Sequence, residues 1–282
     1  MILSFLFVAA SAGCYNGGVV LQASAARRAD PDSALRATLL LRLVHAPTFV
    51  IGTALDAAGW VFQVLALTRA SLTFVQPALG MGVFLLLAFA WFGLSERPRR
   101  ADVLGACALA GGIALIADGA PSQGHAINWA HAVVPVAILA AFVIVPYAVR
   151  TQRRPVVLAI ATGAAFSVTG LTTEVVSRGV VHGHLLLVVF GLSWSVAFGF
   201  FGFLAQTSAL VSGRVTSVIP IVTLIDTAVP VALAPLVFAE RWPSGAGRII
   251  VLAAGIALAV AGAVCLAASP RVGVVRERAS GA

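Results

Sequence analysis

The feature that most constrains this chain is a series of long apolar segments separated by short stretches that carry most of its Arg residues. A helix that crosses the hydrocarbon core of a bilayer needs about 20 predominantly apolar residues. Nine segments approach or exceed that length, at about residues 2–23, 47–68, 72–94, 102–118, 128–149, 155–176, 184–210, 215–238 and 248–268. The sequence therefore predicts an all-α, polytopic membrane protein with about nine transmembrane helices.

Composition excludes several classes of protein. The chain is 60% hydrophobic and 10% charged, whereas soluble domains are about 45–50% apolar and about 25% charged. This excludes a soluble enzyme, a nucleic-acid-binding module and a disordered chain. The chain has no Lys, no nucleophile–base arrangement and no phosphate-binding loop, and its Cys residues lie inside apolar runs. We therefore expect no enzymatic activity, no cofactor, no metal centre and no nucleic-acid partner.

The Arg residues predict the orientation in the membrane. With nine alternating crossings, 14 of the 18 Arg residues fall on one side and four fall on the other, namely Arg69, Arg178, Arg241 and Arg248. Basic residues concentrate in cytoplasmic loops. We expect a multi-pass protein of the cell membrane with its N-terminus outside and its C-terminus in the cytoplasm.

Two segments near the N-terminus have more than one interpretation. Residues 26–46 are more polar, and their Leu spacing fits a short helix on the membrane surface; a degenerate tenth span is the alternative, against which Arg36 and Arg42 argue. Ala23, Ser24 and Ala25 resemble a signal-peptide cleavage site, but no basic residue precedes them. We expect the first segment to be retained as a span, because secretory signals normally begin with positive charge.

The chain contains an internal repeat. The pattern Gly59-Trp60, Gln63, Ala66-Leu67 recurs 143 residues later as Gly202-Phe203, Gln206, Ala209-Leu210. At the same offset Pro77 matches Pro220, and residues 113–115 match residues 256–258; upstream, Tyr15-Asn16 resembles Phe166-Ser167. The repeat divides the chain into a first repeat (1–120), a linking span (121–150), a second repeat (151–269) and a cytoplasmic tail (270–282).

A single linking span gives the two four-helix repeats opposite orientations. Inverted repeats place a central site at their interface, and motion of one repeat against the other opens that site to each side in turn. The repeat therefore favours a carrier.

These motifs resemble the drug/metabolite transporter superfamily, of EamA type. The resemblance rests on residues 58–67, 74–77, 94–97 and 111–115 and on their second-half copies. It is closest to the nine-span, NIPA-like branch, because a polar loop replaces the second helix of ten-span members. The resemblance implies transport of a small solute and is uninformative about which one. The magnesium associated with the NIPA-like branch is not carried over, because the chain shows no acidic cluster.

Polar residues inside the spans are the candidate site, because ionisable groups at that depth are costly and are often functional. Asp56 and Asp226 lie near the middle of their spans; a carboxyl bonded to a neighbouring helix is the structural alternative. Glu174 and Arg178, four residues apart, fit an ion pair at the membrane edge. The predicted substrate-binding residues are Asn16, Asp56, Trp60, Gln63, Gln76, Trp194, Gln206 and Asp226.

Further features suggest how such a site could work. Pro77, Pro220 and Pro230 make spans 3 and 8 candidates for broken, cavity-lining helices. Asp56 and Gln63 are seven residues apart, close to two turns at about 100° per residue, so both should line one wall. Because burial disfavours the charged form of a carboxyl, Asp56 could bind a proton and release it when the cavity opens to water.

The sequence favours a secondary transporter of a small solute, metabolite or drug that works by alternating access and could be proton-coupled. A divalent-cation carrier that uses Asp56 and Asp226 as oxygen ligands is one alternative. A membrane scaffold or lipid-handling protein without transport is another. The expected partners are the lipid bilayer and a small-molecule or ion substrate, and a homodimer is left open.

Overall fold

The computed structural model describes residues 2–94, 99–118, 127–149, 154–239 and 245–268. Over these ranges the chain forms helices and short connections, without strands. The elements, in order, are α1 (Ile2–Ala26), η1 (Pro31–Ser33), α2 (Ala37–Leu43), α3 (Pro47–Leu67), α4 (Leu72–Gly80), α5 (Val83–Leu94), α6 (Arg100–Asp118), α7 (Trp129–Ala148), α8 (Pro155–His182), α9 (Leu185–Ser212), α10 (Val215–Val237) and α11 (Ala246–Ala267).

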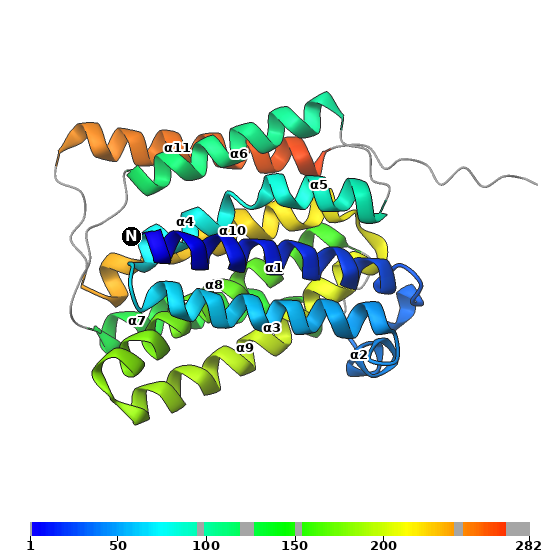
Figure 1. Cartoon of the computed structure of the whole chain (residues 1–282), viewed down its shortest axis with the longest axis horizontal. Helices are drawn as coiled ribbons and strands as arrows, with labels where there is room; N and C mark the ends of the chain where they lie inside the picture. Colours follow the sequence, from blue (N-terminus) through cyan, green and yellow to red (C-terminus); the bar gives the residue numbers. More distant parts are fainter. Residues whose placement is uncertain (1, 95–98, 119–126, 150–153, 240–244, 269–282) are drawn as a thin grey trace, which may run out of the picture.

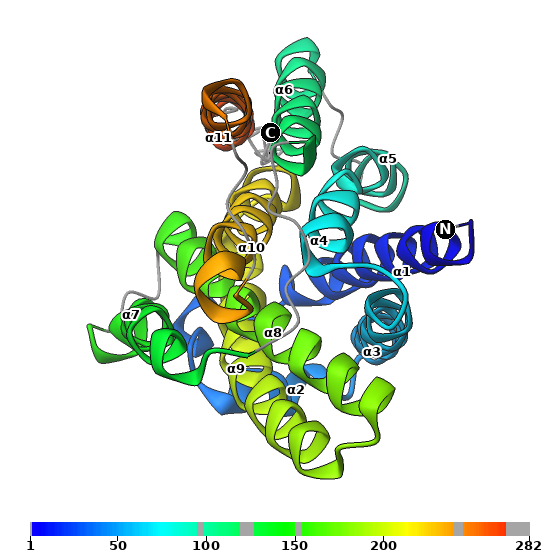
Figure 2. The same ribbon diagram turned by 90° about the vertical axis from the view of Figure 1, so that its left-hand side faces the viewer.

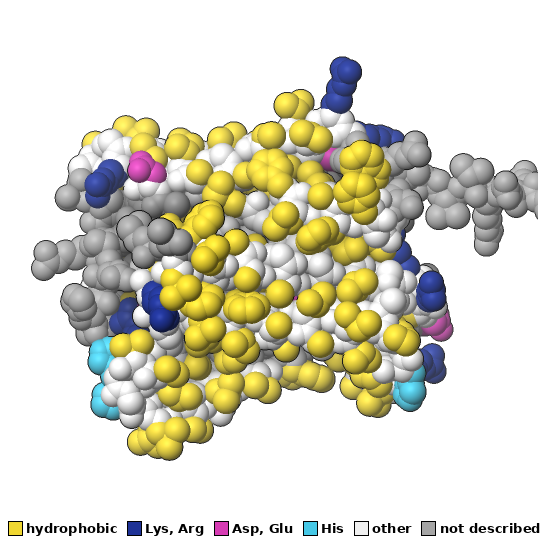
Figure 3. Space-filling view, viewed as in Figure 1, with side chains coloured by type: hydrophobic (Ala, Val, Ile, Leu, Met, Phe, Trp, Pro, Cys, Tyr) yellow, Lys and Arg dark blue, Asp and Glu magenta, His cyan; other side chains and the backbone are white. Residues whose placement is uncertain are grey.

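The long helices lie side by side along one direction of the molecule (Figure 1). Eight helical stretches in the described residues, with α4 and α5 taken together, are long and apolar enough to cross a bilayer. Hydrophobic side chains cover the middle of the face in Figure 3, and Arg, Asp, Glu and His side chains gather towards its two ends. The chain is thus an all-α, multi-pass membrane protein, as its sequence predicts.

The helix boundaries agree with several details of the sequence. Pro47 and Pro155 begin α3 and α8, where a missing N–H has no partner to lose. The segment after α1 contains only η1 and the seven-residue α2, which is too short to span. The shortest expected segment coincides with α6, which is 19 residues long and packs along α11.

Only one of the two expected helix breaks is present. The third segment is interrupted after Gly80, where Met81 and Gly82 separate α4 from α5. The expectation for span 8 was wrong, because α10 is one helix that includes Pro220, Pro230 and Pro235. The break is therefore found where two glycines flank one residue, which leaves the backbone free to leave the helical path.

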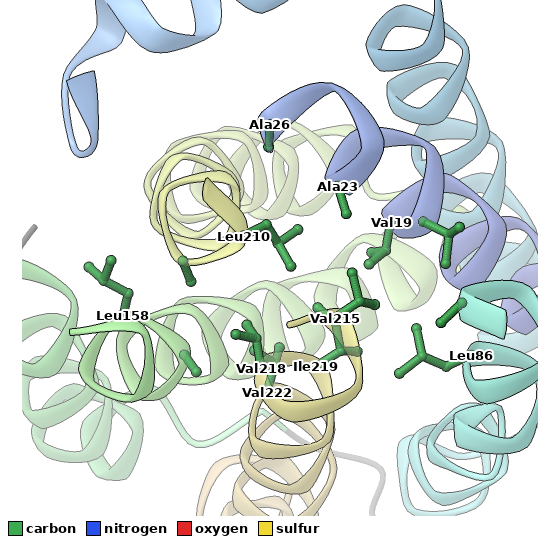
Figure 4. Close-up of a cluster of buried hydrophobic side chains, with 14 residues drawn as sticks. Val19, Ala23, Ala26, Leu86, Leu158, Leu210, Val215, Val218, Ile219 and Val222 are labelled. Atoms are coloured by element: carbon green, nitrogen blue, oxygen red, sulfur yellow. The ribbon is translucent and has the colours of Figure 1, made fainter. Parts of the chain in front are cut away.

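Apolar clusters define the direction of the helices. One cluster joins the last turns of α1 and α9 to the first turns of α8 and α10, through residues such as Val19, Leu210, Leu158 and Val218 (Figure 4). Eight described Arg residues belong to this end of the bundle, which we call the Arg-rich end: Arg27, Arg28, Arg36, Arg42, Arg99, Arg100, Arg154 and Arg214.

A second cluster lies towards the opposite end. It joins the beginning of α1 and the last turn of α3 to α4 and to the later turns of α8 and α10. In the first repeat, α1 thus runs towards the Arg-rich end and α3 runs away from it. In the second repeat, α8 and α9 run in the reverse senses.

Helices α6 and α11 cross closely through glycines. Gly112 faces Gly255 and Ala259, and Gly262 faces Gly105 and Leu109; Cβ atoms at these glycines would meet the backbone of the other helix. Small residues of this kind let membrane helices approach to backbone contact. In Figure 2 this pair lies together at one side of the bundle, while α1, α3, α8 and α9 lie further away.

Candidate functional site

The bundle contains a cavity of about 760 Å³ among α1, α3, α4, α8, α9 and α10. Its wall lies between the two apolar clusters described above, and Val19, Ile219 and Val222 belong both to the wall and to the cluster at the Arg-rich end (Figure 4). A volume of this size is in the range of small-molecule sites, about 300–1,000 Å³. Six of the eight residues expected from the sequence line it: Asn16, Asp56, Trp60, Gln63, Gln206 and Asp226.

Asp56 has one strong partner and one free oxygen. Its Oδ2 accepts a hydrogen bond of 2.6 Å from Nε2 of Gln22 on α1, whereas its buried Oδ1 has no partner. The carboxyl lies directly against Gly18, where a Cβ atom would also meet the Gly52 carbonyl oxygen at 2.7 Å. The close approach of α1 and α3 at these two glycines is what brings Gln22 within reach of Asp56.

Asp226 is less constrained. It lies in the middle of α10 and lines the cavity together with Thr223 and Thr227. Among the residues that the structure describes, Asp226 has no hydrogen bond or ion pair. Its carboxyl is therefore available to a ligand in the cavity.

The two repeat-related glutamines have different surroundings. The Tyr15 hydroxyl donates a 2.7 Å hydrogen bond to Oε1 of Gln63, and the Tyr15 ring lies against Gly59. In the second half Phe166 lies against Gly202, and Gln206, four residues further on, has no side-chain hydrogen bond among the described residues. Gln63 is held in place, whereas the amide of Gln206 can contact a bound solute.

Two more wall residues are held by hydrogen bonds. The Trp60 indole donates a 3.0 Å bond to the Thr173 hydroxyl and so ties α3 to α8. The Asn16 amide donates to the Ala12 carbonyl at 2.8 Å within α1. These bonds fix the orientation of both side chains and leave the Asn16 carbonyl oxygen as an acceptor.

The cavity does not include Gln76 and Trp194. Gln76 is buried between α4 and α8, with its Nε2 against Gly170 and without a hydrogen-bond partner. Trp194 is 41% exposed and stacks on Phe198, with ring centroids 5.6 Å apart. Its neighbour Ser195 lines the cavity, so the rotation of α9 turns Trp194 outwards.

Sequence reasoning did not identify several wall residues. Gln22, which holds Asp56, was not singled out although it is an amide inside a span. Thr53 precedes Asp56 by three residues, and Thr223 precedes Asp226 by three, so helical spacing from the two carboxyls could have found them. Phe200 and Phe203 carry no polar signal, and only the fold brings them to the wall.

The groups outside the cavity have structural roles or remain exposed. Glu174 and Arg178 form the expected ion pair at 2.8 Å, and the Arg178 guanidinium also lies over the Phe238 ring at 4.5 Å. The rings of His182 and His184 stack at the end of the bundle opposite the Arg-rich end. Within the described ranges, no group of three or more His, Cys, Asp or Glu residues could hold a metal ion.

Comparison with known proteins gives one relative. An uncharacterized protein of Corynebacterium glutamicum is 24% identical over 251 residues, which cover 86% of each chain. No family model matches the sequence. No solved structure matches it either.

Proposed function

We propose that this protein is a secondary transporter that moves a small solute across the cell membrane by alternating access around the cavity. The observation that carries the proposal is the cavity itself, which lies at the middle of the helices and presents Asp226 and Gln206 without protein partners. Polar groups at that depth are costly unless they have a function or a partner. A bound solute supplies that partner.

Repeated contacts support two inverted repeats on either side of the cavity. In the first half the Ser11 hydroxyl donates to the Gly59 carbonyl at 2.8 Å, and Tyr15 covers that glycine. In the second half the Thr162 hydroxyl lies 3.5 Å from the Gly202 carbonyl, and Phe166 covers it. An offset of 143 relates the two glycines, and one of 151 relates the residues on α1 and α8.

A second set of contacts repeats in the same register. Asn16 on α1 lies against Gly82, and its counterpart on α8, Ser167, donates a 3.1 Å hydrogen bond to the Ile225 carbonyl. Gly112 and Gly255, also 143 residues apart, face each other between α6 and α11. Equivalent points of two repeats can touch only near the axis that relates them, so this crossing fits a two-fold axis in the membrane plane.

The proposal keeps the rest of the expected architecture. It takes α6 as the ninth span, α7 as the linking span and the Arg-rich end as cytoplasmic, with the N-terminus outside and the C-terminus inside. It places the chain in the drug/metabolite transporter superfamily, of EamA type and close to the NIPA-like branch. A rocking motion of the two halves would open the apolar cluster at one end while the cluster at the other end stays packed.

Proton coupling through Asp56 is part of the same proposal. The free Oδ1 atom of Asp56 can take up a proton, and the groups nearby are Gln22, Tyr15 and Cys14 on α1 and Asp226 on α10. None of these groups is basic, so an ionised Asp56 has no counter-charge in the cavity. Protonation removes that charge before the site moves through the bilayer.

Solute counterflow into proteoliposomes tests the proposed function. Vesicles preloaded with one unlabelled solute should transiently accumulate the same labelled solute from outside. Leucine, citrate, choline and Mg²⁺ would be tried singly, to represent a neutral solute, an organic anion, an organic cation and a metal ion. The matched control is Gly199→Trp, because a Cβ atom at Gly199 has no neighbour closer than 4.0 Å and a large side chain would fill the cavity.

We expect counterflow with one class of solute and its loss in Gly199→Trp. A Mg²⁺ signal would favour the divalent-cation carrier. Absence of counterflow for all four solutes, from a protein that is folded in detergent, would favour the scaffold or lipid-handling alternative.

A further inference from the structure

The charge and the aromatic content of the cavity wall define a substrate class, and this inference rests on the proposed function. Two carboxyls, Asp56 and Asp226, line the cavity, and no basic side chain is found among the described residues of its wall. Five aromatic rings also line it: Tyr15, Trp60, Phe166, Phe200 and Phe203. We propose that the substrate is an aromatic or otherwise lipophilic organic cation, with Asp226 as its counter-charge.

Electrostatics favours a cation over an anion or a neutral solute. An ionised carboxylate in an apolar cavity is costly unless it is paired, and the cavity wall offers no protein cation to pair with it. In addition, α4 ends at Gly80 on the wall of the cavity. The C-terminal end of a helix carries partial negative charge and also favours a cation.

The aromatic rings favour an organic cation over a metal ion. Ring faces attract cations such as alkylammonium or pyridinium groups, and the attraction is stronger where water is excluded. A hard divalent cation instead takes about six oxygen ligands. Two carboxylates in a mainly apolar wall fit that requirement poorly, and the described residues contain no metal-binding group of three or more His, Cys, Asp or Glu residues.

Asp226 fits the role of counter-charge better than Asp56 does. The Asp56 carboxyl already accepts from Gln22, and its other oxygen is packed against Gly18. Asp226 has no partner in the part of the chain that the structure describes, and the Thr223 and Thr227 side chains lie one turn or less from it on the same wall. The two carboxyls therefore divide the work: Asp226 binds the cation and Asp56 carries the proton.

The position of the cavity favours a lipophilic molecule. Four wall residues are also exposed on the surface of the molecule, and all come from α3 and α9: Val61 (50%), Leu192 (41%), Val196 (64%) and Phe200 (47%). Helices α3 and α9 touch near the Arg-rich end, where the ring centroids of Phe49 and Phe203 are 5.7 Å apart. Beyond this contact the cavity reaches the apolar surface that faces lipid, which a lipophilic cation can occupy.

Equilibrium binding to the purified full-length protein in detergent tests the proposal without requiring transport. Isothermal titration would compare three probes with two aromatic rings each at pH 8: the cation N-methyl-4-phenylpyridinium, neutral 4-phenylpyridine and the anion 4-biphenylcarboxylate. We expect the cation to bind at least about tenfold more tightly than the neutral probe, from its added charge and cation–π attraction. We expect no measurable binding of the anion.

Three variants assign the effect to residues. Asp226→Asn should weaken binding of the cation by about tenfold or more and leave the neutral probe within about twofold, because only the charge is lost. Asp56→Asn should weaken cation binding less. Asp118→Asn, at an exposed position at the end of α6 outside the cavity, should leave both affinities unchanged.

Equal affinity for the cation and the neutral probe would overturn the proposal, as would tighter binding of the anion or an unchanged cation affinity in Asp226→Asn. The comparison of probes on the unmodified protein decides the question even if a variant fails to fold. Cation selectivity without counterflow would leave a cation-binding protein that is not a transporter. Counterflow of another solute without cation selectivity would reject the substrate class and retain the transporter.

Discussion

The helix pair α1 and α3 in the first half and the pair α8 and α9 in the second half share one packing motif and differ in chemistry. In each pair a hydroxyl approaches a glycine carbonyl, and an aromatic ring covers that glycine. In the first half the ring is Tyr15, which bonds Gln63; in the second it is Phe166, which cannot bond Gln206. The position equivalent to Asp56, 143 residues on, is Gly199.

This difference teaches how one backbone arrangement can serve two roles. The first half holds its polar groups through Gln22, Tyr15 and Thr173. The second half leaves Gln206 free and replaces the carboxyl by open space at Gly199. We infer that the first half carries the titrating group on a rigid support, while the second half, together with Asp226 on α10, adapts to the solute.

The largest expected effect comes from removing the carboxyl that distinguishes the two halves. Asp56→Asn keeps size and hydrogen-bonding capacity but cannot titrate. We expect loss of accumulation of N-methyl-4-phenylpyridinium driven by a pH gradient, by about tenfold or more, while counterflow without a gradient survives. The measurement is uptake into proteoliposomes with the pH gradient imposed in each direction. Normal gradient-driven accumulation would make Asp56 structural and leave Asp226 as the carboxyl to test.

The next effect concerns the close contact that supports Asp56. A Cβ atom at Gly18 would meet the Gly52 carbonyl oxygen at 2.7 Å and would also contact the Asp56 carboxyl, whereas Gly199 has 4.0 Å of free space. Gly18→Ala should destabilise the protein by about 1–3 kcal/mol through overpacking. Gly199→Ala should have little effect on stability. Thermal unfolding in detergent compares the two, and equal melting temperatures would refute the close packing of α1 on α3.

An exchange of Tyr and Phe should make the halves more alike. Tyr15→Phe removes the bond to Gln63 and should cost about 1 kcal/mol of stability, with tighter or unchanged binding of the cation. Phe166→Tyr should supply the equivalent bond to Gln206 and weaken cation binding, because the amide is then occupied. Thermal unfolding and titration with N-methyl-4-phenylpyridinium measure both. If Phe166→Tyr leaves Gln206 unbonded and binding unchanged, the two positions are not equivalent.

The smallest effects separate the inner and outer aromatic residues. Trp60→Leu removes one ring and one hydrogen bond from the wall and should weaken cation binding by a few fold, as expected for a single cation–π contact of about 0.5–2 kcal/mol. Trp194→Leu should leave binding unchanged, because Trp194 stacks on Phe198 outside the cavity. A reversed order of the two variants in the same titration would contradict the rotation of α9.

How much of this could be predicted from sequence differs between segments and faces. Helix existence followed from apolar length, and helical spacing placed Asp56, Trp60 and Gln63 on one side of α3. Spacing cannot say which side of a helix turns inwards, so Trp194 and Ser195 were indistinguishable until packing against α8 fixed α9. Proline content also failed to locate the helix break, because α10 tolerates three prolines while Gly80, Met81 and Gly82 interrupt the third segment.

Partners across helices were the least predictable part of the site. The bond between Gln22 and Asp56 joins residues 34 positions apart, and it depends on the approach of α1 and α3 at Gly18 and Gly52. No local pattern encodes that approach. The sequence repeat nevertheless indicated which positions to compare, since Gly59 and Gly202 occupy matching places in the two helix pairs.

The central claim is that one cavity opens to each side of the membrane in turn, and accessibility of a single cysteine at its wall tests it most directly. Cys14, Cys107 and Cys265 would be replaced and Gly199→Cys introduced; Ser193→Cys, exposed on α9 but outside the cavity, is the control. A membrane-impermeant maleimide would be applied to sealed proteoliposomes from outside or from inside. The account predicts labelling of position 199 from either side and protection by N-methyl-4-phenylpyridinium, with position 193 unlabelled. Labelling of position 199 from one side only would contradict alternating access.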